Sequence, residues 1–327
     1  MKRLGQTLPP GLVKASDDRD ARIEERLETI RALRRESDDA VPFEHIKIII
    51  DACWPIMFDH GFDAAANVFL DLTAEFPDSL RFAGLYHARE VQFTLGELGD
   101  FARRGRNLQP FDGARLFDNG PDALAIRLAR SFGPRKMDAT IDDFFLERAL
   151  RRRGVSLLIL HDGLDLSYLG GFGSFYRRLD DAIHWLEDIA ADYDKAFYLG
   201  QSATGYSALY FAGRSRIKAV MGLSAPTLHD PTEARAAFYR QRVAKLVGEH
   251  RMDLRPLFES WDGAAHLWYG VGRSADARYA QHLDGCPGVR LFPLDTTNHG
   301  LLNRWGDEEI NAAVDMMLSD IKPGAHR

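Results

Sequence analysis

Apolar segments of strand length alternate with segments of helix length from about residue 120 onward, and this alternation restricts the fold more than any other feature. The strand candidates are 123–132, 155–161, 195–200, 217–224, 264–270 and 289–294. Helix candidates lie between and after them, at 142–154, 175–191, 203–213, 232–248, 274–283 and 307–320. The run 155–161 is apolar throughout, which is typical of a strand buried on both faces. Strands joined by helices predict right-handed crossovers and a mostly parallel sheet flanked by helices, an α/β fold.

The first third of the chain has a different pattern. Residues 17–37 are highly charged with a thin apolar stripe, 43–60 and 61–76 are typical of a helical pair, and 79–104 predict another helix or two. Part of this region resembles a tetratricopeptide hairpin, but over fewer units than the three that a stacked core needs. We therefore predict a helical, tetratricopeptide-like subdomain at 1–110 and an α/β domain at 111–327, which suits 327 residues.

Composition excludes several classes of protein. A net charge of −6 disfavours nucleic acid and other polyanionic partners. No apolar run approaches the roughly 20 residues that span a bilayer, and the N-terminus lacks an export signal, so we expect a cytoplasmic protein without a membrane span. Cys53 and Cys286 form no metal-binding or disulfide pattern, and no phosphate-binding loop is present. We expect no metal and no cofactor.

The segment Tyr198–Gly205 carries the strongest chemical signal. An apolar strand leads into Gly200-Gln201-Ser202, and a helix of small residues follows at once. A serine at such a sharp turn projects its hydroxyl clear of the sheet, and glycine two residues earlier avoids a collision within the turn. Free N–H groups at the start of the helix stabilise an oxyanion. This pattern predicts Ser202 as a nucleophile, although a serine that only caps the helix is the alternative.

His299 is the candidate base. It lies in the loop Asp295–Gly300, directly after the strand candidate 289–294, and therefore at the same edge of the sheet as Ser202. A neutral imidazole is the usual base for a serine hydroxyl. A histidine bonded within its own turn remains the alternative.

On these motifs, GQSATG, the following strand IKAVMGLS and the late TNHG, residues 120–320 resemble the α/β-hydrolase superfamily. The stretch LLILHDGLDLSYLGGFGSF further resembles a group of little-characterised bacterial hydrolase-like proteins, some of them associated with helical repeats or glycan assembly. The resemblance implies hydrolysis or transfer of an ester, thioester or other acyl group at a serine. The implied substrate is a small-molecule or glycan-linked acyl compound.

Three departures from that family pattern concern the site. Thr204 stands where the second glycine of G-x-S-x-G is usual. The candidate for the acidic residue that supports His299 is Asp276, because it is the first acidic residue after the strand candidate 264–270. Asp230 and Asp262 are rival candidates. No HGGG loop is present, so the backbone N–H of Ala203 and one from Phe132–Gly133 are the predicted oxyanion donors. Further pocket residues are predicted to be Gln201, His161, Asp162 and Tyr168.

The sequence also permits two further interpretations, one of an insertion and one of the function. The segment 225–262 lies where such folds often insert a lid over the site. The altered elbow and the uncertain acid also permit an inactive hydrolase-like scaffold, which would act through a protein partner bound by the N-terminal helices. Loss of function in a Ser202→Ala variant of unchanged abundance would count against the scaffold.

Overall fold

The computed structural model of the chain divides into two compact units, Met1–Arg103 and Arg104–Arg327. The described residues are 28, 32, 41–42, 81–86, 89–110, 113–129, 136–161, 168–228, 253–302, 304–324 and 326. Among them, no helix has both the length and the apolar character needed to cross a bilayer.

The smaller unit contains a sheet that the sequence did not predict. Strands β2 (Arg81–Tyr86) and β3 (Arg89–Thr94) form an antiparallel pair, and β1 (Val41–Pro42) pairs with β2. The helix predicted over 79–104 is therefore wrong in its first part, and only α4 (Leu95–Arg104) is helical. Polar and apolar residues alternate one by one along Glu90–Thr94, which is the period of a strand. The other N-terminal helices predicted above lie almost entirely outside the described residues.

The larger unit is built on one eight-stranded sheet with the order β11-β10-β9-β8-β6-β7-β5-β4. Its six strands from β6 to β11 run parallel, whereas β5 lies antiparallel to β7 and β4 lies antiparallel to β5. The mostly parallel sheet expected from the sequence is confirmed. The strands are β4 Arg106–Asn107, β5 Ala114–Phe117, β6 Ala123–Leu128, β7 Val155–Leu160, β8 Lys195–Gln201, β9 Ala219–Leu223, β10 Ala264–Gly270 and β11 Val289–Leu294.

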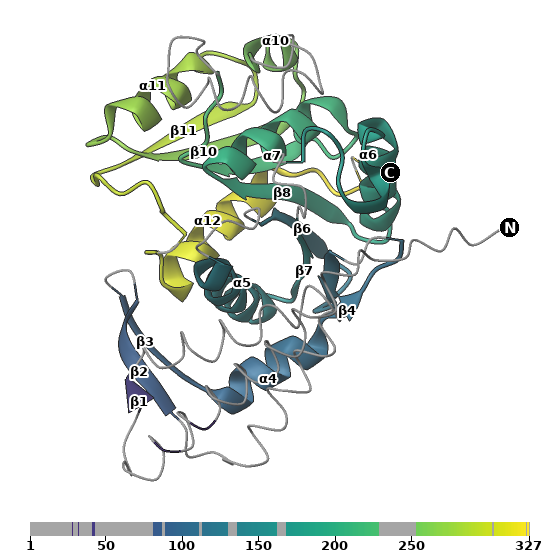
Figure 1. Ribbon diagram of the computed structural model, residues 1–327. Coiled ribbons are helices and arrows are strands. Elements are labelled where there is room, and N and C mark those ends of the chain that lie inside the picture. Colours follow the sequence, from purple (N-terminus) through teal and green to yellow (C-terminus); the bar gives the residue numbers. More distant parts are fainter. Residues whose placement is uncertain are drawn as a thin grey trace, which may run out of the picture. The chain divides into compact units, whose positions relative to one another are not determined.

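Helices cover both faces of this sheet (Figure 1). They are α5 Lys136–Arg151, α6 Leu179–Ala190, α7 Ala203–Arg214, α10 Arg255–Phe258, α11 Ser274–His282 and α12 Asp307–Asp320, with a 3-10 turn at Gly173–Phe175. Leu267 on β10 belongs to the same buried cluster as Leu209 on α7. Its neighbour His266 bonds to Asp320 at the end of α12 through Nε2 and Oδ2, 2.8 Å apart. Adjacent strand residues point to opposite faces, so α7 and α12 lie on opposite sides of the sheet.

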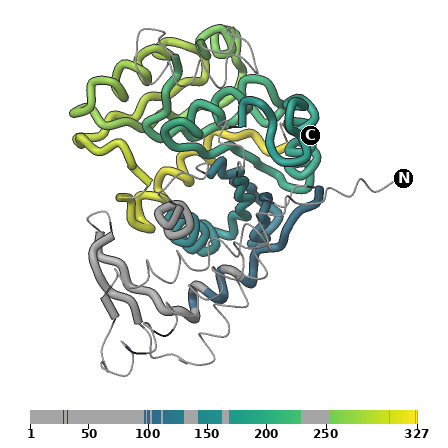
Figure 2. Tube along the Cα trace, viewed as in Figure 1, coloured from purple at the N-terminus to yellow at the C-terminus, as the bar shows by residue number. Residues whose placement is uncertain are grey.

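Helices α5 and α12 pack against each other, although they are far apart in the chain. Arg152, just after α5, and Asp307, at the start of α12, are 155 residues apart and pair with each other. Figure 2 shows the yellow C-terminal helix returning beside the teal α5. Arg148 of α5 and Arg152 just beyond it both pair with Asp307 at the start of α12, at 3.3 and 2.5 Å. Acidic Asp307 also suits the positive N-terminal end of α12. The residues of the candidate site follow the carboxyl ends of strands β8, β10 and β11 in the chain.

Candidate active site

Ser202 occupies a strained turn between β8 and α7. Its φ is 57° and its ψ is −129°, a conformation that residues with a side chain adopt rarely. The Ser202 N–H donates to the carbonyl oxygen of Leu223 on β9 at 2.9 Å, and the Ser202 carbonyl accepts from the N–H of Gly205 at 2.9 Å. Such backbone strain persists only where the surrounding structure imposes it, and it occurs preferentially at functional sites.

Two glycines and a threonine shape this turn. A Cβ on Gly200 would overlap the backbone carbonyl of Thr204, and a Cβ on Gly205 would lie 2.6 Å from the Cβ of Ala225. The Thr204 hydroxyl donates to the Gln201 carbonyl at 3.0 Å. Thr204 therefore braces the turn, and the glycine needed for close packing stands one residue later than in the usual motif. The departure at Thr204 is compatible with a complete elbow.

We predict that Gly200→Ala destabilises the protein by about 3 kcal/mol or more, because the new Cβ meets backbone that cannot move independently. Gly213→Ala is the matched control. It lies in α7, the helix that follows the turn, and the atoms nearest to its Cβ would belong to the Leu257 side chain, at 3.0 Å and beyond. Because alanine also favours helix, the control is expected to change stability by less than about 1 kcal/mol. Urea denaturation of the two variants measures the difference, and equal stabilities would contradict the packing argument.

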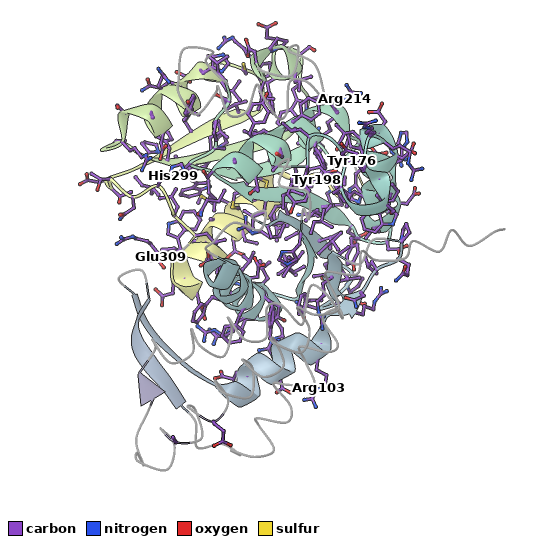
Figure 3. All side chains as sticks on the ribbon, viewed as in Figure 1. Arg103, Tyr176, Tyr198, Arg214, His299 and Glu309 are labelled. Atoms are coloured by element: carbon purple, nitrogen blue, oxygen red, sulfur yellow. The ribbon has the colours of Figure 1, made fainter. Side chains whose placement is uncertain are left out.

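The structure brings Ser202, His299 and Asp276 together. The Ser202 Oγ lies 2.6 Å from the His299 Nε2. The His299 Nδ1 lies 3.0 and 2.9 Å from the two carboxylate oxygens of Asp276. This geometry fits an Nδ1–H that donates to Asp276, which leaves Nε2 free to accept the serine proton. Figure 3 shows His299 on the segment after β11, at the edge of the sheet.

Of the two candidate carboxylates in the described part of the chain, Asp276 is the one that lies within hydrogen-bonding distance of His299. It lies in the first turn of α11, after β10, and only 2% of its side chain is exposed. The guanidinium of Arg273 lies 3.5 Å from its Oδ1. Asp262 is exposed and precedes β10, so it lies at the opposite edge of the sheet from Ser202. Asp230 lies outside the described residues.

The loop that carries His299 is fastened on two sides. The Asn298 N–H and side-chain amide both donate to the Thr296 Oγ1, at 3.1 and 2.9 Å. The Leu302 N–H donates to the Oε1 of Gln201 at 2.7 Å. Gln201 is buried and directly precedes the serine, so its amide ties the histidine loop to the elbow. This contact of Gln201, which was predicted to line the pocket, is to the backbone of Leu302.

The remaining predicted site residues have different positions. Ala203 begins α7, where backbone N–H groups have no partner inside the helix. Tyr168 is fully buried, and its hydroxyl lies 2.7 and 2.5 Å from the carbonyl oxygens of Ala129 and Leu160. Tyr168 thus braces the ends of β6 and β7 instead of presenting its hydroxyl to a pocket. The predicted residues outside the described part of the chain are Phe132, Gly133 and Asp162.

His161 belongs to a buried charged cluster that the sequence did not predict. Asp143 on α5 lies 3.6 Å from the Arg127 guanidinium and 3.8 Å from the His161 Nε2. Burial raises the pKa of Asp143 to about 6, against the opposing effect of Arg127. Burial, with the nearby charges of Arg127 and Arg115, lowers the pKa of His161 to about 3. His161 is therefore a neutral core residue near pH 7. The sequence feature that could have indicated this cluster is Arg127, a charged residue within the apolar strand candidate 123–132.

The cluster predicts a pH effect on stability. As the pH falls below about 6.5, the unfolded chain protonates His161, whereas the folded chain protonates Asp143 near pH 6. The two proton uptakes offset each other until about pH 4. In Asp143→Asn only the unfolded chain gains a proton, so stability falls on acidification from pH 6.5 by up to about 1.4 kcal/mol per pH unit.

Denaturant titrations of the wild type and Asp143→Asn at several pH values between 4 and 7 test this slope. Adding a His161→Asn substitution to the Asp143→Asn variant is expected to remove the extra slope, because the unfolded chain then gains no proton at that position. Parallel pH profiles of the wild type and Asp143→Asn would contradict the assignment.

Within the described part of the chain, no group of three or more His, Cys, Asp or Glu side chains is arranged to hold a metal ion.

Comparisons with known proteins identify relatives in structure only. No family model and no curated protein sequence matches this chain. The structure of 2,6-dihydroxy-pseudo-oxynicotine hydrolase is similar, with 14% identity, a TM-score of 0.50 and coverage of 93% of this chain and 88% of that one. An alpha/beta hydrolase enzyme from the metagenome of lagoon sediments at Mar Chica, Morocco, has 13% identity and a TM-score of 0.47, covering 66% of this chain and 97% of that one. An S-formylglutathione hydrolase from Agrobacterium tumefaciens has 10% identity and a TM-score of 0.45, covering 66% and 93%. At these identities the likeness is one of fold.

Proposed function

We propose that this chain, which has the α/β-hydrolase fold, is a serine hydrolase that acts on an ester, thioester or other acyl substrate through an acyl-enzyme on Ser202. The hydrogen-bonded series Ser202–His299–Asp276 carries the proposal. Three side chains, from the turn before α7, the first turn of α11 and the loop after β11, meet in the order that proton transfer requires. A serine that only capped α7 would need neither the histidine nor the buried carboxylate, and the Ser202 side chain makes no cap hydrogen bond in that helix.

In the proposed first step, the Ser202 Oγ attacks the acyl carbonyl while the His299 Nε2 accepts its proton. A bond forms between Oγ and the carbonyl carbon, and the carbonyl electrons move onto oxygen. Asp276 stabilises the imidazolium that forms, because its buried carboxylate already accepts the Nδ1–H. Collapse of the intermediate expels the alkoxide or thiolate, which takes the proton from His299.

Backbone N–H groups would stabilise the developing oxyanion. The Ala203 N–H, at the start of α7, is aided by the positive end of the helix dipole. A second donor is proposed from Phe132–Gly133, between β6 and α5. Both donors are backbone groups, so the missing HGGG motif does not prevent such a site.

The second step mirrors the first. Water, or another hydroxyl acceptor, gives its proton to His299 and attacks the acyl-enzyme, and Ser202 then recovers its proton. Water yields hydrolysis and an alcohol yields acyl transfer from the same intermediate. The substrate that we propose is a small-molecule or glycan-linked acyl compound.

A series of p-nitrophenyl esters from acetate to octanoate tests the proposal. We expect a burst of nitrophenolate equal to the enzyme concentration, followed by slower steady turnover if deacylation limits the rate. Intact mass spectrometry of the quenched protein should show one added acyl group. Release of nitrophenolate at the buffer rate for every ester, with no acylated protein, would refute the function.

A further inference from the structure

Ser224 lies beside the candidate nucleophile in the sheet. It directly follows β9, and the preceding residue, Leu223, accepts the hydrogen bond from the Ser202 N–H at 2.9 Å. Its own N–H donates to the Trp268 carbonyl on β10 at 2.7 Å. Ser224 is thus fixed at the carboxyl edge of the sheet, between β8, which leads to Ser202, and β10, which leads to Asp276.

The backbone at Ser224 is strained in the same sense as at Ser202. Its φ is 46°, and the described residues contain only three other non-glycine positions with a positive φ. Part of this turn has a packing explanation, because the next residue, Ala225, places its Cβ against Gly205 in the first turn of α7. The turn requires a positive φ, yet the residue there is serine and not glycine. The packing explains the backbone but gives no role to the hydroxyl.

The Ser224 hydroxyl is buried without a hydrogen bond. The residue is 1% exposed, and its Oγ has no hydrogen-bond partner among the described residues. Other buried serines of this unit are bonded: the Ser156 Oγ donates to the Gly120 carbonyl at 2.8 Å, and the Ser215 Oγ to the Ile217 carbonyl at 3.2 Å. An unsatisfied buried hydroxyl destabilises a fold, so a partner that arrives with a ligand explains its presence.

We propose that the Ser224 hydroxyl contacts the substrate, and that it hydrogen-bonds to an oxygen of the acyl group or leaving group bound at Ser202. This inference rests on the serine-hydrolase function proposed above. An ester brings two oxygens to the nucleophile, and a hydroxyl can donate to either of them. The unpaired hydroxyl destabilises the free enzyme, and a hydrogen bond to the substrate removes that destabilisation in the complex.

Ser224→Ala tests the inference, with Ser215→Ala as the matched control. Alanine keeps the same strained backbone and removes only the oxygen. We expect Ser224→Ala to lower kcat/KM for p-nitrophenyl acetate about tenfold, as the loss of one hydrogen bond to substrate would, while the melting temperature stays the same or rises. Ser215 lies at the far end of α7 and its hydroxyl is bonded, so its alanine variant should melt lower and keep its activity.

Opposite results overturn the inference. Activity of Ser224→Ala within twofold of the wild type would show that the hydroxyl does not contact the substrate. A drop in melting temperature as large as that of Ser215→Ala would show a structural hydroxyl. If Ser224→Ala does not fold, Ser224→Gly is measured against the same thresholds, because glycine accepts the positive φ. A wild type that forms no acyl-enzyme would refute the proposed function and this inference together, whereas an active wild type with an unaffected Ser224→Ala refutes this inference alone.

Discussion

Ser202→Ala is expected to lower kcat for p-nitrophenyl acetate by about 10⁵-fold or more. The methyl group of alanine cannot attack a carbonyl, so no acyl-enzyme can form. The positive φ at 202 is no worse for alanine than for serine, so the variant should fold and melt close to the wild type. Steady-state rates and thermal melts of both proteins measure the two effects.

Ser215→Ala serves as the control for serine replacement on the same helix, because it removes a buried hydroxyl distant from the elbow. Its kcat should remain within about twofold of the wild type. Equal activity of Ser202→Ala and the wild type would mean that the turnover arises elsewhere in the chain or from a contaminant.

Asp276→Asn is expected to lower kcat about 10⁴-fold with little change in fold. An asparagine cannot stabilise the imidazolium by charge. Its amide can also donate to the His299 Nδ1, which would place the imidazole proton on Nε2 and leave that atom unable to accept the proton of Ser202. The present 2.9 and 3.0 Å distances from Nδ1 to both carboxylate oxygens make this effect direct.

Asp262→Asn is the matched control, because Asp262 was a rival for the same role and lies at the other end of β10. It should leave kcat unchanged. The assignment of the acid would be wrong if Asp262→Asn were as damaging as Asp276→Asn, or if Asp276→Asn kept more than a tenth of the activity.

The sequence predicted the α/β part of the fold well where periodicity was strong. The helix predicted at 307–320 has those bounds in α12, and β10 and β11 also agree with their predicted ranges. The short strands β4 and β5 were missed, since two and four residues are too few to show an alternation. The hairpin of β2 and β3 was predicted as helix, because the resemblance to a helical repeat outweighed the alternation in Glu90–Thr94.

The candidate triad was predictable because its members follow strands at one edge of a parallel sheet. Ser202 and His299 could be placed by position along the chain, whereas position left Asp276 with Asp230 and Asp262 as rivals. Ser224 and the pair Arg127–Asp143 could not be placed in this way. Their significance depends on burial and on missing or distant partners, and tertiary packing decides both.

Labelling with a fluorophosphonate is the decisive measurement for Ser202 as nucleophile, because the reagent bonds to a serine activated by a neighbouring base and requires no knowledge of the substrate. We expect one stoichiometric adduct on the wild type, mapped by peptide mass spectrometry to Ser202, and no adduct on Ser202→Ala. An unlabelled wild type, or an adduct that persists in Ser202→Ala, would contradict this role of Ser202.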